Sequence, residues 1–64
     1  MVRINGTEET AAGMLLKDYL EQNGYPAGGI AVECNERIVA KHDYENYVIT
    51  DGDVIEVVSF VGGG

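Results

Sequence analysis

A single segment of this sequence has the periodicity of an amphipathic helix, and this limits how the rest of the chain can be covered. Ala12, Leu16 and Leu20 recur every four residues, and Tyr19 widens the same apolar stripe. Gly24 follows at the position where a glycine commonly ends a helix. One helix can cover one face of a sheet, so the remaining regular segments are expected to form a mixed sheet with its other face open.

The start of the predicted helix is marked less clearly than its end. Thr10 can cap a helix, but Gly13 weakens a helix that begins there. The expected start therefore moves toward Met14, while Pro26 prevents the helix from resuming after its end.

The first residues predict a β-hairpin. Residues 2–5 alternate between apolar and polar, and Asn5-Gly6 suits the two positive φ angles of a type I′ turn. The return strand, residues 7–10, contains two adjacent glutamates and no large apolar side chain. Such a strand is expected at a solvated edge of the sheet, where charge blocks unwanted pairing.

Short strands and turns follow the helix. Residues 30–34 and 38–40 are expected to be strands on either side of a turn at 35–37, and residues 41–50 are expected to hold a single turn of helix. Residues 54–61 form the strongest predicted strand. Along it, one face carries Ile55 and Val57, and the other carries Val54, Glu56, Val58 and Phe60.

The turn before this last strand is Asp51-Gly52-Asp53. Its two aspartates are interpreted as solvated turn residues and not as part of a calcium loop, because the other ligands of such a loop are missing.

This order of elements predicts an α+β fold, the ubiquitin-like β-grasp, with one main helix packed on one face of a mixed sheet. Residues 1–61 are expected to form the β-grasp domain and residues 62–64 a flexible C-terminal tail. The predicted core consists of Ile4, Leu16, Leu20, Val32, Ile55 and Val57.

Charge and size narrow the possible functions. The 64 residues include 11 acidic and 4 Lys or Arg side chains, for a net charge of −7. Such a surface is repelled by nucleic-acid phosphates and by anionic membranes, and it favours a partner with a basic face. No membrane span is expected, because residues 54–61 fall far short of the roughly 20 apolar residues required. A ligand pocket of roughly 300–1,000 Å³ would hollow out most of so small a core, which argues against a self-contained small-molecule enzyme.

The lone cysteine and lone histidine are both given structural interpretations. Cys34 alternates with Ile30 and Val32 and is expected to act as a small apolar residue, since no cationic neighbour in the sequence would lower its pKa. His42, beside Asp43, is interpreted as a surface histidine. One cysteine and one histidine are too few for a metal site. A small domain without a disulfide framework indicates a cytoplasmic protein.

The run Gly62-Gly63-Gly64 allows two interpretations. Glycines do not help a strand to fold, because each raises the entropy lost on ordering. The run is either a frayed terminus or a slender peptide that enters a tunnel in another protein and presents the carboxylate of Gly64. Its position directly after the last strand of a β-grasp favours the second. Val58 and Phe60, on the open face, are either an incidental apolar patch or partner contacts beside this tail.

Four segments together carry a family resemblance: Val2-Arg3-Ile4-Asn5-Gly6, Leu16-x-x-Tyr19-Leu20, Ala31-Val32 to Asn35, and residues 51–64. With them the sequence resembles the ThiS-like sulfur carrier proteins of thiamine biosynthesis over essentially its whole length. Ala40 departs from the pattern, because many members have a proline before the basic residue there. The glycine pair of the family corresponds to Gly63-Gly64, with Gly62 as an extra spacer.

The resemblance implies a protein co-substrate and not an enzyme. An adenylating, ThiF-like activating enzyme would use MgATP to adenylate the carboxylate of Gly64. A cysteine desulfurase or rhodanese-type persulfide would supply sulfur, and a ThiG-like thiazole synthase would accept it. The chain itself would bind no cofactor and no metal. Its partner contacts would be Gly62, Gly63, Val58, Phe60 and Val61.

Two other classes remain open on the sequence. One is a related sulfur carrier for molybdopterin or another pathway, which differs in the synthase that it binds. The other is a ubiquitin-like modifier or a plain interaction module. A modifier would form isopeptide bonds, and a plain module would work without its tail.

Overall fold

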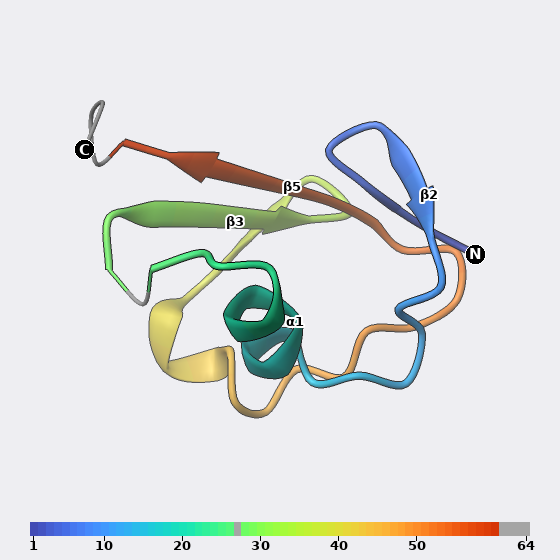
Figure 1. Cartoon of the computed structure of the whole chain (residues 1–64), viewed down its shortest axis with the longest axis horizontal. Helices are drawn as coiled ribbons and strands as arrows, with labels where there is room; N and C mark the ends of the chain where they lie inside the picture. The colour runs from blue at the N-terminus through green and yellow to red at the C-terminus, as the bar shows by residue number, and fades with distance from the viewer. Residues whose placement is uncertain (27, 61–64) are drawn as a thin grey trace.

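In the computed structural model, which describes residues 1–26 and 28–60, a five-stranded sheet packs one face against a single α-helix (Figure 1). The elements in chain order are β1 (Val2–Ile4), β2 (Thr7–Glu9), α1 (Leu16–Gln22), β3 (Ile30–Cys34), β4 (Arg37–Val39), the 3₁₀ turn η1 (Lys41–Asp43) and β5 (Val54–Ser59). The last strand ends at Ser59, so the predicted strand was one described residue too long at Phe60. Val61 and the predicted tail at 62–64 lie outside the described residues.

The strand order β2-β1-β5-β3-β4 places β5 at the centre of the sheet. β5 runs parallel to β1 and antiparallel to β3, so the sheet is mixed. With the helix on one face, this is the predicted ubiquitin-like β-grasp, and the prediction is confirmed.

The N-terminal hairpin has the predicted turn and the predicted edge strand. Asn5 and Gly6 have φ angles of 51° and 83°, the left-handed pair that a type I′ turn needs. β2 pairs with β1 alone and forms one edge of the sheet. On these two strands Arg3 and Glu8 form an exposed ion pair.

The helix begins later than the sequence predicted. α1 starts at Leu16, two residues after the expected start near Met14, and no side chain caps it. The reason is a long-range pairing that holds the preceding segment extended. The Gly13 N–H donates to the Ile49 carbonyl at 2.7 Å, and the Ile49 N–H donates to the Met14 carbonyl at 2.8 Å. These bonds take up backbone groups that an earlier helical turn would need.

The end of the helix is as predicted. Gly24 has a φ of +77°, and its N–H donates to the Glu21 carbonyl at 3.2 Å. The N–H of Tyr25 reaches back to the Leu20 carbonyl at 2.9 Å. This pair of bonds is the Schellman arrangement, in which a left-handed residue closes the last turn.

The turn between β3 and β4 is one residue shorter than predicted. Asn35 and Glu36 have φ angles of 54° and 70°, so two left-handed residues complete the turn. Arg37 then pairs with Cys34, and β4 begins one residue earlier than expected. The single helical turn predicted within residues 41–50 is present as η1.

All six predicted core residues are buried between the sheet and α1, each at most 7% exposed: Ile4, Leu16, Leu20, Val32, Ile55 and Val57. Ala12 does not belong to this core, contrary to the predicted stripe. It is exposed because it precedes the helix, and its neighbour Ala11 is buried instead. Tyr19 adds a polar link, since its hydroxyl donates to the carboxylate of Glu9 at 3.1 Å.

Truncation of Leu20 to alanine is expected to lower the free energy of unfolding by about 2–5 kcal/mol, because it leaves a cavity under α1. Ile38 supplies the control, since it is 70% exposed. Ile38→Ala should change the same quantity by no more than about 0.5 kcal/mol. Urea titrations of both variants measure the difference. Equal midpoints would show that the helix does not bury Leu20.

Candidate partner-binding site

The central strand β5 presents opposite environments on its two faces. Ile55 and Val57 are buried toward α1, whereas Val54 and Val58 are 46% and 56% exposed on the far face. Phe60, just after the strand, is 65% exposed. The alternation predicted from the sequence is therefore present residue by residue.

The neighbouring strands extend this apolar surface. Ala31 on β3 lies directly opposite Val58, and Ile38 on β4 is 70% exposed. Ile38, Val58 and Ala31 line one shallow hollow. We call the surface formed by Ile38, Val54, Val58 and Phe60, together with Glu33 and Glu56, the open face. The sequence analysis missed Ile38, because a three-residue strand is too short for its alternation to assign a face.

Two carboxylates lie at the middle of the open face. Glu33 on β3 and Glu56 on β5 are direct cross-strand partners, and both are exposed. Within the described part of the chain neither forms an ion pair with a Lys or Arg. Like charges in this arrangement destabilise a sheet. A cationic group of a partner placed between them would relieve that repulsion.

The start of β5 is fixed by Asp53, which the sequence analysis wrongly placed on a solvated face. Asp53 is 8% exposed, and its carboxylate accepts three hydrogen bonds at 2.9 Å. The donors are the side-chain amide of Asn35, the hydroxyl of Tyr47 and the backbone N–H of Thr50. The amide oxygen of Asn35 in turn accepts from the Val54 N–H at 2.9 Å. The aspartate therefore joins the β3–β4 turn to the segment that leads into β5.

The hydrogen bonds also set the charge state of Asp53. Burial raises the pKa of its carboxyl group, but the bonds from Thr50, Asn35 and Tyr47 outweigh that effect and hold the pKa below its ordinary value of 3.8. Asp53 is consequently ionised near neutral pH, and its role is structural.

Cys34 and His42 occupy the positions expected of them. Cys34 is 5% exposed, and its Sγ lies against the hydroxyl of Tyr47. Burial raises the pKa of the thiol, which lowers the fraction of reactive thiolate. His42 is exposed on η1, with its Nε2 3.6 Å from the carboxylate of Asp43.

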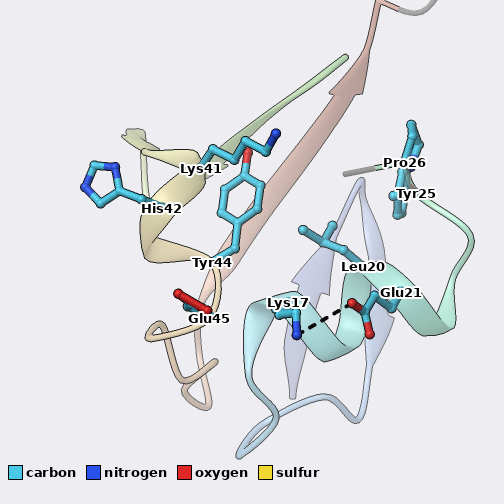
Figure 2. Close-up of a pocket in the computed structure, with 9 residues that line it drawn as sticks. All are labelled: Lys17, Leu20, Glu21, Tyr25, Pro26, Lys41, His42, Tyr44 and Glu45. Atoms are coloured by element: carbon cyan, nitrogen blue, oxygen red, sulfur yellow. Dashed lines mark ion pairs between the residues drawn. The ribbon is translucent and has the colours of Figure 1, made fainter. Parts of the chain in front are cut away.

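A larger hollow lies on the helix side of the molecule. It has a volume of about 490 Å³ and runs between α1 and the segment that begins at η1 (Figure 2). We call it the helix-side groove; its lining residues are Lys17, Leu20, Glu21, Tyr25, Pro26, Lys41, His42, Tyr44 and Glu45. The sequence argument that a cavity of this size must hollow out the core is therefore wrong, because this one is a surface groove.

The described residues do not include every predicted site residue. Val58 and Phe60 are brought together on the open face, whereas Val61, Gly62, Gly63 and Gly64 lie outside the described range. Among the residues described, no three His, Cys, Asp or Glu side chains gather in a way that could hold a metal ion. No helix in that same part of the chain is long and apolar enough to cross a membrane.

Comparison with known proteins gives consistent matches along the chain. Residues 2–64 match the model of the ThiS family. The sulfur carrier protein ThiS of Thermus thermophilus is 38% identical over 64 residues, which cover 100% of each chain. A thiazole synthase of Paramagnetospirillum magneticum is 40% identical over 62 residues. That match covers 95% of this chain, which spans only 19% of the synthase.

A solved structure shares the fold. The crystal structure of the thiamine biosynthesis protein ThiS from Geobacter metallireducens matches with a TM-score of 0.75 and covers 98% of this chain and 97% of that one. At 24% sequence identity this likeness shows the fold alone.

Replacing Asp53 with asparagine is expected to lower the free energy of unfolding by about 1–3 kcal/mol at pH 7. The NH₂ group of the new side chain would face an N–H or O–H donor where a carboxylate oxygen now accepts a hydrogen bond. The pKa of Asp53 is lowered in the folded state, so its stabilisation is fully present above its unfolded value of 3.8. That stabilisation is lost as the pH falls through the lower folded value. The difference between wild type and Asp53→Asn should therefore shrink below pH 3.8.

Asp51→Asn, in the same turn, serves as the control. Asp51 is exposed and forms a surface ion pair with the amino group of Met1, which contributes little to stability because water and salt screen it. Chemical denaturation at a series of pH values measures all three proteins. A pH-independent difference for Asp53→Asn would contradict the assigned charge state.

Proposed function

The chain belongs to the ThiS family, and we propose that it carries sulfur on its C-terminal carboxyl group and delivers it to a thiazole synthase. As a member of that family it is a small sulfur carrier protein of thiamine biosynthesis and not itself a catalyst. The observation that carries the proposal is the end-to-end match to the Thermus thermophilus carrier. The named relatives thus favour the thiamine pathway over the other carriers considered from the sequence.

The proposed chemistry begins with activation of Gly64. A carboxylate is a poor electrophile until its oxygen becomes part of a good leaving group. The Gly64 carboxylate attacks the α-phosphorus of ATP on an adenylating enzyme and releases pyrophosphate. MgATP is bound by that enzyme and not by the carrier.

Sulfur then replaces AMP. The terminal sulfur of a persulfide, from a cysteine desulfurase or a rhodanese-type donor, attacks the acyl carbon and expels AMP. A thiol cleaves the S–S bond of the resulting acyl disulfide, which leaves a thiocarboxylate on Gly64. Tethering the sulfur to a docked protein raises its local concentration at the synthase.

The fold suits this use of the C-terminal end. β5 is the central strand, and it ends on the side of the molecule away from the N-terminus (Figure 1). Hydrogen bonds to both neighbours anchor it, and the Asp53 network fixes its start. A docked carrier therefore has a rigid strand leading toward residues 61–64.

The open face is the proposed docking surface for both enzymes. Val58 and Phe60 supply exposed apolar area beside the end of β5. Glu33 and Glu56 supply negative charge at its middle, and among the described residues neither is paired with a Lys or Arg. An apolar centre with complementary charge is what a specific interface requires, and the net charge of −7 favours a basic partner.

The synthase relatives support the choice of sulfur acceptor. Two thiazole synthases, from Paramagnetospirillum magneticum and Magnetococcus marinus, match 95% and 98% of this chain with 19% and 20% of their own lengths. A carrier-like segment within a synthase polypeptide is the arrangement expected if the two functions act on each other. The separate carrier is proposed to dock on the equivalent enzyme.

Changes at the glycine end should block activation without unfolding the protein. Deleting Gly64 moves the carboxylate by up to about 3.6 Å, and Gly63→Val adds a branched side chain to a peptide that must enter a narrow channel. Displacements of about 1 Å can cost about 100-fold in rate, so losses of at least that size are expected. Pyrophosphate release by the activating enzyme measures the rate.

The control for this series is Gly28→Val. A Cβ at Gly28 meets no atom within 4 Å, and its φ is not in the left-handed region. This variant should be activated at the wild-type rate. Full activity of the Gly64 deletion would remove the terminal carboxyl group from the mechanism.

Changes on the open face should weaken enzyme binding more than folding. Val58→Ser and Phe60→Ala are each expected to raise the dissociation constant of the activating enzyme about tenfold, the effect of losing about 1.4 kcal/mol at an interface. Val48→Ser is the matched control, because Val48 is 52% exposed but bridges to Leu15 near the start of α1. Calorimetric titration distinguishes them, and equal effects at Val48 and Val58 would count against the open face.

A further inference from the structure

The helix-side groove is not used by the sulfur carrier function, which places its partners on the open face and at the C-terminal end. The groove has a volume of about 490 Å³, a size typical of sites for small molecules. It is formed on one side by α1 and the residues after it, and on the other by η1 and Tyr44 (Figure 2).

The walls of the groove are suited to a flat apolar body. Leu20 lies on the α1 side, and Tyr25 and Pro26 continue that side beyond the end of the helix (Figure 2). Tyr44 lies across the groove from them. Rings on two sides can hold an aromatic group by stacked or edge contacts.

The lining of the groove is less acidic than the protein as a whole, because its two lysines are matched by two glutamates, Glu21 and Glu45. Two of the four Lys and Arg residues, Lys17 and Lys41, line the groove although the net charge is −7. The Nζ of Lys17 is engaged with Glu21 at 3.8 Å. Lys41, by contrast, has no ion pair within the described part of the chain, and in the view of Figure 2 its ammonium group is drawn at the hydroxyl end of Tyr44. Glu45 lies at the other end of Tyr44 from Lys41 in that view.

Tyr44 supplies a second free polar group. The residue is only 8% exposed, yet its hydroxyl has no hydrogen-bond partner among residues 1–26 and 28–60. Among the described residues, every side-chain N or O atom that is fully shielded from solvent has a hydrogen-bond partner. The Tyr44 hydroxyl has none, so it must be in contact with solvent. The hydroxyl therefore opens to the groove. Burial of the ring raises the pKa of Tyr44, so the hydroxyl keeps its proton and can donate it to an acceptor.

We propose that the helix-side groove is a binding site for a small aromatic anion. The carboxylate or phosphate of the ligand is held by the Lys41 ammonium group and the Tyr44 hydroxyl. Its flat body lies against Leu20, Tyr25 and Pro26. A carboxylate and a phosphate can both accept hydrogen bonds from these two groups, and the experiment below determines which of them binds better.

The test uses the whole chain labelled with ¹⁵N and titrated with 2-naphthoate and, in a second arm, 2-naphthyl phosphate. 2-Naphthalenemethanol, which keeps the ring system without the charge, is the ligand control. Both anions should shift the amide signals of Leu20, Tyr25, Tyr44 and the 41–43 turn, and the better ligand identifies the preferred acid group. The uncharged alcohol should bind about tenfold or more weakly, because a hydrogen bond to a charged group is worth about 1.5–3 kcal/mol.

Variants separate this site from general attraction. Lys41→Met should weaken binding of the anions about tenfold, and Tyr44→Phe should weaken it several-fold while the ring wall is kept. Arg37→Met is the matched control, because Arg37 is exposed on β4 and does not line the groove; it should bind as wild type does. Each variant is first checked for an unchanged amide spectrum away from its site.

Three results would overturn the proposal. They are equal affinity for the anions and the alcohol, unchanged affinity in Lys41→Met, and shifts centred on the open face at Ala31, Val54 and Val58. None of them bears on sulfur transfer, so this proposal and the carrier function fail or stand separately.

Discussion

The buried carboxylate of Asp53 is the interaction on which the arrangement of the sheet depends. It binds the β3–β4 turn through Asn35, the loop after η1 through Tyr47, and its own turn through Thr50. The backbone carbonyl of the same residue accepts from the Arg3 N–H of β1 at 3.0 Å. A short domain has little apolar area with which to fix such a junction. A charged acceptor with three donors does so with directional bonds.

The sequence predicts what is set locally and misses what is set by distant contacts. Asn5-Gly6 specifies its turn by φ angle, and the faces of β5 follow from alternation, so both are predicted correctly. The predicted helix start is wrong because the true start depends on the hydrogen bond from the Gly13 N–H to the Ile49 carbonyl. These two residues are 36 positions apart in the sequence (49 − 13). The role of Asp53 is missed for the same reason, since its donor Asn35 is 18 residues away. Neither pairing leaves a local signal.

The single helix also explains how the candidate site arises. Because α1 covers only one face of the sheet, the opposite face keeps Val54, Val58 and Ile38 in contact with solvent. Those residues could be predicted on β5 but not on β4, where the strand is too short. Covering these exposed apolar side chains with a partner would lower the free energy of the complex, because apolar surface is removed from water. The same strand that displays this face leads to the residues proposed to carry sulfur, so docking and delivery share one element.

The position of the sulfur is the measurement that tests the central claim most directly. The intact protein is incubated with MgATP, the activating enzyme and a persulfide donor, and fragment masses then locate the modification. The account predicts that one oxygen is replaced by one sulfur at Gly64, that the change needs ATP, and that Cys34→Ser gains it equally. Sulfur found on Cys34, or added to the wild-type protein without ATP, would contradict it.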